Sequence, residues 1–188
     1  ALELLLRKQR EGLKCAYFCF NKNLAGKVRD YFKKVELDET IHVHSIHTFL
    51  YSSLKSAGHL PHSGLKDSNY WNNLLPQQFK LFQDSLEITN YDYIIIDEAQ
   101  DVFCEPLISS ILTNLKEGVE SGKWAMFVDY TYQQFYGGFD SEYFQFFINT
   151  FPCNQQMLAL NCRNHTDIIK AASLHSGLPL MPCRRTKT

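Results

Sequence analysis

Two adjacent carboxylates, Asp97 and Glu98, end an apolar run in the segment YDYIIIDEAQD at residues 91–101. The run predicts a buried strand, and successive side chains of a strand point in opposite directions, so the two acids can serve different targets. Asp97 could hold a magnesium ion, usually through water, and Glu98 could orient and deprotonate an attacking water. The simpler interpretation is that Asp97 or Asp101 caps a following helix. The full string IIIDEAQD favours the catalytic interpretation.

Length and composition allow one sizeable core, because the chain has 188 residues, of which 45% are hydrophobic. A formal net charge of -1 provides no strong basic field for nucleic acid, although a groove can still be locally basic. No run approaches the ~18 apolar residues of a membrane-spanning helix, and no signal peptide opens the chain. We therefore expect a cytoplasmic protein without a membrane partner. The six cysteines lack C-x-x-C and zinc-like spacing, which predicts reduced and mostly buried thiols.

Short β-type runs alternate with helical patterns along the chain. The predicted strands cover residues 15–20, 41–45, 93–97, 124–129 and 157–161. The predicted helices cover residues 2–11, 22–34, 46–57, 76–86, 105–121, 141–149 and 165–175. Near-continuous apolar strands separated by helices predict a parallel sheet covered on both faces, which is an α/β fold in three layers. The polar segment 58–75, rich in Gly, Pro, Ser and Asn, is predicted to be a loop or a small insertion.

Polar residues follow each predicted strand. In open α/β sheets, ligands gather beyond the carboxyl ends of the strands, so these residues are candidates for binding or catalysis. Besides Asp97 and Glu98, the candidates are Asn21, Lys22, Ser45, His47, Asp129, Asn161 and Arg163.

The string IIIDEAQD resembles the Walker B motif, D-E-x-Q-D, of UvrD/Rep-type superfamily 1 helicases. Other segments resemble motifs of the same family in the same order, namely FCFNKNLAGKV (18–28), SIHTF (45–49), VDYTYQQFYGG (128–138) and LALNCRN (158–164). The resemblance implies the P-loop NTPase fold of a first RecA-like motor domain. It also implies that residues 1–188 are part of that domain, with a small insertion at 58–90 and a linker toward the second motor domain beginning at 164–188.

On the nucleotide side, the resemblance implies ATP and Mg²⁺ as cofactors. Asp97 would coordinate Mg²⁺, Glu98 would be the catalytic base, and Gln133 would sense the γ-phosphate and couple it to DNA. Arg163 would reach the phosphates and stabilise their charge. Asp129 would belong to the same nucleotide-binding group.

On the DNA side, the resemblance implies single-stranded DNA and a second RecA-like domain of the same parent chain as partners. Tyr136 would lie near the single strand as a base-stacking platform. Four other residues would contact the DNA backbone or couple it to the ATP site, namely Asn21, Lys22, Ser45 (where the family usually has Thr) and His47. The segment YWNNLLPQQF (70–79) resembles a compact branch of the family that is often attached to nuclease-related domains. An attached nuclease-related domain is therefore a further candidate partner.

Several positions depart from the family pattern. The spacing from Asp129 to Gln133 is one residue longer than usual, which makes Gln134 the alternative sensor. Gly138 stands where many relatives carry a stacking Trp, and Cys162 replaces the usual Tyr. No G-x-x-x-x-G-K-[ST] occurs in the chain, so the backbone cradle for phosphates is missing. We therefore expect a fragment that lacks the phosphate loop, its preceding strand and the second motor domain, and that is a poor ATPase alone.

Other interpretations remain open. The histidines His42, His44 and His47 have no cysteine or carboxylate at zinc spacing, so a metal site is not expected there. Of the aromatic segment 130–147, we expect Phe144, Phe147 and Ile148 in the core and, besides Tyr136, Tyr132 or Phe139 as weaker candidates for base stacking. A nucleotide-binding switch of regulatory or defence function, without unwinding, is the alternative to the motor. A structural remnant that binds neither ATP nor DNA is the third possibility.

Overall fold

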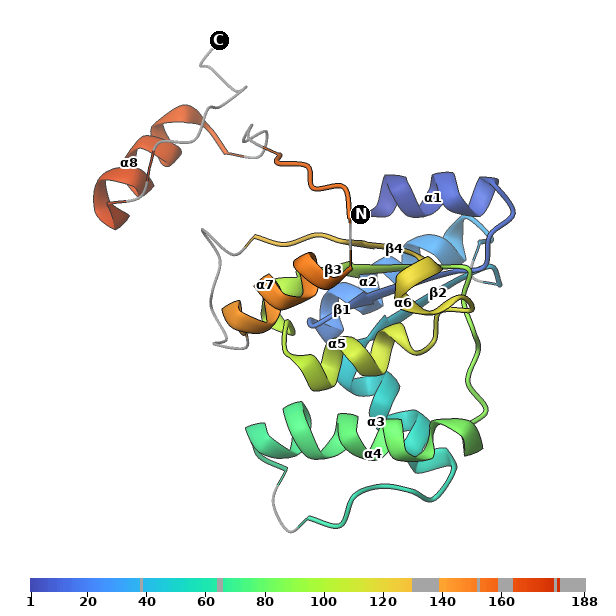
Figure 1. Ribbon diagram of the computed structural model, residues 1–188. Coiled ribbons are helices and arrows are strands. Elements are labelled where there is room, and N and C mark those ends of the chain that lie inside the picture. Colours follow the sequence, from blue (N-terminus) through green and yellow to red (C-terminus); the bar gives the residue numbers. More distant parts are fainter. Residues whose placement is uncertain are drawn as a thin grey trace. The chain divides into compact units, whose positions relative to one another are not determined.

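The chain divides into two units, Ala1–Phe151 and Pro152–Thr188. The computed structural model describes residues 1–37, 39–63, 66–129, 139–151, 153–158, 164–177 and 179. In the second unit it describes helix α8 (Thr166–Ser176), labelled in Figure 1. The His165 side chain accepts a hydrogen bond from Asp167 N at the start of this helix, and Gly177 ends it with a φ of 70°. The remaining helices and strands belong to the first unit.

A parallel sheet forms the centre of the first unit (Figure 1). Its strands are β1 (Cys15–Cys19), β2 (Ile41–Ser45), β3 (Tyr93–Asp97) and β4 (Lys123–Met126), in the spatial order β2-β1-β3-β4. Every pair in this sheet is parallel, which confirms the predicted α/β class with a parallel sheet. All residues of β1 are buried, as expected for a strand with neighbours on both sides and helices on both faces.

Helices cover both faces of the sheet. Side chains alternate between the faces, so that Ala16 and Phe18 join one apolar cluster while Cys15 and Tyr17 join the other. The Tyr17 face is covered by α1 (Leu2–Arg10) and α2 (Lys22–Lys34). The Phe18 face is covered by α3 (Ile46–Ser56), the π-helical turn η1 (Tyr70–Leu74), α4 (Leu75–Phe82), α5 (Glu105–Leu112) and α7 (Ser141–Thr150). The short elements η2 (Gln83–Ser85), η3 (Ala99–Asp101) and α6 (Gly118–Ser121) complete the unit.

The predicted helix 105–121 is wrong as a single element. It is divided into α5 and α6 because the backbone between them pairs elsewhere. Tyr91 N donates to Asn114 O at 2.8 Å and Lys116 N donates to Tyr91 O at 3.1 Å. These bonds take up groups that a continuous helix would need, and sequence periodicity cannot reveal them because Tyr91 is distant in the chain.

Two other predictions differ from the structure. In the predicted strand 157–161, Met157 and Leu158 have no regular structure and are 86% and 79% exposed, while 159–161 lie outside the described residues. The segment 58–75, predicted to be a loop, ends in the π-helical turn η1, which runs directly into α4. Buried Tyr70 and Leu75 anchor this turn in the core, so tertiary packing overrides the polar composition.

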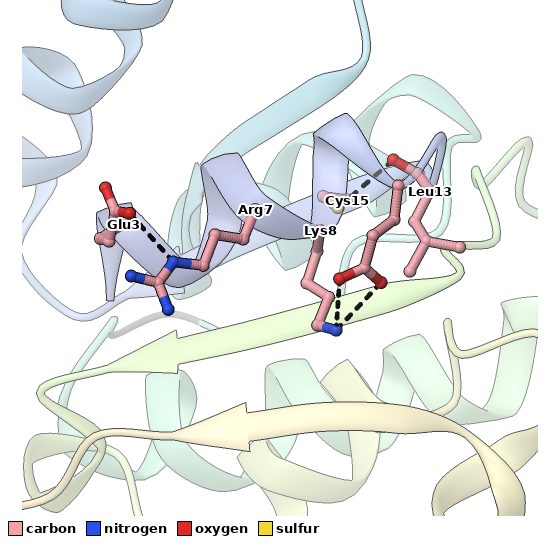
Figure 2. A network of polar contacts seen from close by, with 6 residues as sticks. Glu3, Arg7, Lys8, Leu13 and Cys15 are labelled. Atoms are coloured by element: carbon pink, nitrogen blue, oxygen red, sulfur yellow. Dashed lines mark hydrogen bonds and ion pairs between the residues drawn. The ribbon is translucent and has the colours of Figure 1, made fainter.

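Helix α1, which was predicted over residues 2–11, is amphipathic. Leu5 is fully buried, whereas the outer face carries ion pairs, of which Figure 2 shows Arg7 Nε at 3.0 Å from Glu3 Oε1. Exposed pairs of this kind contribute only about 0–1 kcal/mol, so burial of the apolar face holds the helix on the sheet.

Figure 2 also shows the Cys15 thiol donating to Leu13 O at 3.3 Å. Burial raises the pKa of Cys15 to about 11, which keeps this thiol protonated at neutral pH.

Membrane insertion has no structural support among the helices. None of the described helices combines the length and apolar character that crossing a bilayer requires.

Substitution of Gly122 tests the close approach of α6 to the start of β4. Gly122 N donates to Gly118 O at 2.8 Å, and a Cβ at position 122 would overlap this same carbonyl oxygen. We expect Gly122→Ala to lower the free energy of unfolding by about 1–3 kcal/mol in urea denaturation. The matched control is Gly26→Ala in α2, where a Cβ meets no atom within 4 Å and should stabilise by about 0.5–1 kcal/mol. Equal stability of the two variants would contradict the close approach.

Candidate functional site

The carboxyl ends of three strands lie side by side. Cys19 at the end of β1 is in register with Ser45 of β2 and with Asp97 of β3. The chain leaving β4 joins the same edge, because Phe127 N donates to Ile96 O and Ala99 N donates to Phe127 O, both at 2.9 Å. The polar residues at the ends of these strands therefore lie at one edge of the sheet. An open α/β sheet binds its ligands at this edge.

Asp97 is held by a buried phenol. The Tyr17 hydroxyl donates to Asp97 Oδ2 at 2.6 Å, and Tyr17 is fully buried while Asp97 is half-buried. Burial, followed by this hydrogen bond and the charge of Asp97, raises the pKa of Tyr17 far above its ordinary value, so the phenol stays protonated and donates. The contact fixes the orientation of the carboxylate at the strand end.

Glu98 is held by a buried amide. Gln100, only 3% exposed, donates from Nε2 to Glu98 Oε2 at 2.7 Å and accepts at Oε1 from Asp129 N at 3.0 Å. Glu98 also has a φ of 52°, a left-handed conformation that costs a non-glycine residue on the order of 1 kcal/mol or more. Gln100 thus links the Glu98 carboxylate to the chain after β4. Sequence reasoning assigned no role to Gln100, although a glutamine two residues after the carboxylate could have indicated one.

Helix capping does not explain the acidic residues. Helix α5 begins after Cys104, and Glu98 makes no side-chain cap bond to η3. Asp101 lies half-buried, and burial together with the negative charge of Glu98 raises its pKa. The interpretation of Asp97 or Asp101 as the cap of the following helix is therefore wrong for α5.

The predicted DNA-contacting residues have different environments. Asn21 caps α2, where its Oδ1 accepts from Asn23 N at 2.9 Å and from Leu24 N at 3.1 Å. Ser45 is buried and donates to Thr48 Oγ1 at 2.8 Å. These two side chains therefore shape the ends of β1 and β2, whereas Lys22 is exposed at the start of α2.

A groove of about 510 Å³ runs between α2 and the start of α3. It brings together Lys22 and Ser45, two of the predicted DNA-contacting residues. The residues that give it polar character are Lys22, Asn23, Lys27, Arg29, Asp30, Ser45 and Thr48. Three cations and one acid make the groove locally basic in a chain with a net charge of -1, which suits a phosphate backbone.

Four predicted site residues lie outside the described residues, namely Gln133, Tyr136, Asn161 and Arg163, as do Gln134 and Tyr132. Phe139 is half-buried, and its ring centroid lies 5.9 Å from that of Phe103 in the core. Phe147 is buried with 2% exposure, and Phe144 and Ile148 pack against the same cluster, which confirms their assignment to the core.

His42 and His44 share a buried partner. The Tyr91 hydroxyl lies 3.1 Å from His42 Nδ1 and 3.3 Å from His44 Nε2. Since the phenol carries one proton, it can donate to only one imidazole, and the other imidazole must donate to it. Within the described part of the chain, no group of three or more His, Cys, Asp or Glu side chains could hold a metal ion.

The strand edge offers Mg²⁺ a carboxylate of the kind that it takes in nucleotide sites. Magnesium commonly binds through one or two carboxylates, several waters and the phosphates of a substrate, so a cage of protein ligands is unnecessary. Asp97 presents a carboxylate with one oxygen bonded to Tyr17, and this donor type fits that mode.

Removal of the Tyr17 hydroxyl tests its hydrogen bond to Asp97. Tyr17→Phe leaves the ring in the core but deletes the donor to a charged acceptor. We expect the free energy of unfolding to fall by about 1.5–3 kcal/mol in urea denaturation. Tyr31→Phe, at a position that is 45% exposed, should change it by less than about 0.5 kcal/mol. A Tyr17→Phe protein as stable as the parent would show that the bond contributes nothing.

Acidification tests the buried histidine. Burial, with the nearby charges of His42 and Arg29, lowers the pKa of His44 from 6.5 to about 4. The unfolded chain therefore takes up a proton near pH 6.5 that the folded chain refuses until about pH 4, so stability falls as pH drops through this window. The loss attributable to His44 should be on the order of 3 kcal/mol.

Urea denaturation of two variants between these pH values measures the loss. His44→Gln should flatten the pH dependence, whereas the exposed His62 provides the control His62→Gln, which should leave it unchanged. An unchanged slope in His44→Gln would assign the proton uptake to other groups.

Comparisons with protein-family models, with curated proteins and with solved structures find no match for this chain. The resemblance to UvrD/Rep-type helicases therefore rests on the order of the motifs in the sequence. What the chain does must be inferred from that order and from the geometry of the strand edge.

Proposed function

We propose that this chain is part of the ATP-dependent motor of a UvrD/Rep-like DNA helicase or translocase, which couples ATP hydrolysis to movement on single-stranded DNA. In this proposal it is the larger part of a first RecA-like domain. The phosphate loop and the second RecA-like domain would be supplied elsewhere in the parent chain, because no G-x-x-x-x-G-K-[ST] occurs in these 188 residues.

One observation carries the proposal. Residues from separate motif-like segments meet at a single edge of the parallel sheet, with Cys19 in register with both Ser45 and Asp97. Each of these residues belongs to a different segment that resembles a helicase motif. A parallel sheet brings all of its strand ends to one edge, and the segments that resemble the helicase motifs are the ones found at this edge, as a nucleotide motor requires.

The described residues suit the chemistry of ATP hydrolysis. Asp97 would hold Mg²⁺, which when bound neutralises charge on the phosphates, and Tyr17 keeps that carboxylate oriented. Glu98 would accept a proton from the attacking water as general base. Gln100 positions Glu98 and connects it to Asp129, where the segment containing Gln133 begins. Gln133 as sensor and Arg163 as phosphate contact remain predictions from the resemblance.

The groove between α2 and α3 supports the DNA side of the proposal. Lys22 and Lys27 are exposed there, and the groove begins directly after the ends of β1 and β2. Strand β1 therefore separates the proposed nucleotide edge at Asp97 from the proposed DNA edge at Ser45. This proximity suits a motor in which closure of two domains around ATP moves a single strand.

The test is ATP hydrolysis by the full parent protein, with and without single-stranded DNA. We expect stimulation by single-stranded DNA, and we expect Glu98→Gln to lower turnover by about 10²–10⁴-fold while ATP binding is retained, because only proton transfer is lost. The matched control is Glu105→Gln, which removes an exposed carboxylate 3.4 Å from Lys80 and should leave turnover unchanged.

Three results would contradict the proposal. Unchanged turnover in Glu98→Gln would remove Glu98 from the role of general base. ATP binding without any stimulation by single-stranded DNA would favour a nucleotide-dependent switch, and loss of both activities in the parent would favour a structural remnant.

A further inference from the structure

Four half-buried rings form a continuous row beside the groove, which we call the aromatic shelf. The row begins just after β1, passes the start of α3, crosses to η1 and returns to the middle of α3. The ring centroids of successive members lie 5.7, 5.8 and 5.9 Å apart, and the members are Phe20, His47, Trp71 and Tyr51. Of these rings, only His47 is predicted from the sequence to contact DNA. Phe20 lies in the motif-like segment 18–28 without an assigned role, Tyr51 lies in the predicted helix 46–57, and Trp71 lies in the segment 58–75.

The shelf is held in place by hydrogen bonds and core packing. Trp71 Nε1 donates to Lys66 O at 3.1 Å, and the Trp71 ring packs edge-on against buried Tyr70 at 5.2 Å. His47 Nε2 lies 3.2 Å from Asn72 Oδ1. Trp71 sits on a π-helical turn, a geometry that is rare and that occurs frequently at functional sites. Rings fixed in this way lose little conformational freedom when a flat ligand stacks on them.

The shelf adjoins the basic groove along the chain at the start of α3, and its rings lie outside the set of residues that line the groove. His47 lies between Ser45 and Thr48, and both of these residues line the groove on the α3 side. The exposed cations Lys22 and Lys27 line the opposite side. A positively charged groove flanked by aromatic rings is the usual combination for single-stranded nucleic acid, because the groove follows the phosphates while bases stack on the rings.

The charge around the shelf disfavours a cationic ligand. Lys66 Nζ lies 4.6 Å above the centroid of the Tyr51 ring and donates to the Tyr51 hydroxyl at 3.1 Å. The ring therefore already carries a cation on one face, and a second cation would be repelled. A phosphate beside Lys66 would be attracted instead.

We propose that the aromatic shelf contacts the bases of single-stranded DNA whose phosphates occupy the groove between α2 and α3. The inference rests on the proposed function and extends it, since it adds Trp71 and Tyr51 to the DNA-contacting surface. In this proposal the small insertion is part of the DNA-binding surface and does more than connect α3 to β3.

Tryptophan fluorescence tests the shelf directly, because the chain contains two tryptophans, Trp71 and Trp124. Trp124 packs against Phe147 and donates to Val119 O at 2.9 Å, so it reports on the core. In Trp124→Phe, titration with a short oligothymidylate should quench the remaining emission, which comes from Trp71. In the reciprocal variant Trp71→Phe, the emission of Trp124 should not change.

Affinity variants separate stacking from folding. Trp71→Leu and Tyr51→Leu keep an apolar side chain but remove the flat ring, and each should weaken binding of the oligothymidylate by about five- to hundredfold. Phe146→Leu removes a ring on α7 that is 60% exposed and should not change the affinity. Circular dichroism of each variant checks that the fold is retained.

The outcomes distinguish the shelf from the proposed function. If Lys22→Ala weakens binding while Trp71→Leu and Tyr51→Leu bind normally, DNA occupies the groove and the shelf proposal is overturned. The absence of any binding or quenching also overturns the shelf. The proposed function has its own readout, stimulation of the parent ATPase by single-stranded DNA, which stands or falls independently of the shelf variants.

Discussion

In-register parallel pairing of β1 with both of its neighbours is the constraint on which the rest of the structure depends. A parallel ladder sends every strand in the same direction, so all carboxyl ends reach one edge. Because Cys19 aligns with Ser45 and Asp97, residues separated by up to 78 positions in the chain become lateral neighbours there. A shift of one residue would exchange the two faces of a strand and remove its apolar side chains from the core. Burial of both faces therefore also holds the edge residues in place.

Two buried polar contacts fix the acidic side chains at this edge, just as strand pairing fixes the backbone. Tyr17 reaches Asp97 from within the core of one face, and Gln100 joins Glu98 to the backbone at Asp129. Buried donors of this kind are costly when unpaired, so each contact strongly favours a single arrangement of its carboxylate. The left-handed backbone at Glu98 is a local strain that the surrounding packing must offset. The orientation of the two carboxylates thus depends on buried core residues as much as on the strand end.

The opposite side of β1 has a different character. There the groove is open, its cations are exposed, and the adjoining rings are only half-buried. Exposed charges and ring faces of this kind can contact a ligand without enclosing it. The acidic edge and the basic groove are nevertheless separated by only one strand, which places two chemically distinct environments within a short distance of one another.

The sequence by itself determined the class of fold, the four strands and most of the helices, because apolar periodicity and turn residues are local properties. It also placed Asp97 and Ser45 at the ends of strands, and Glu98 and Lys22 after strands, which is why their meeting at one edge could be anticipated. Only the tertiary structure decided four other features: the break between α5 and α6, the hydrogen bond from Tyr17 to Asp97, the link through Gln100, and the row of rings that runs from Phe20 to Tyr51. Each of these depends on a contact between residues brought together by folding or on a backbone conformation fixed by packing, and no local pattern of residue types encodes either one.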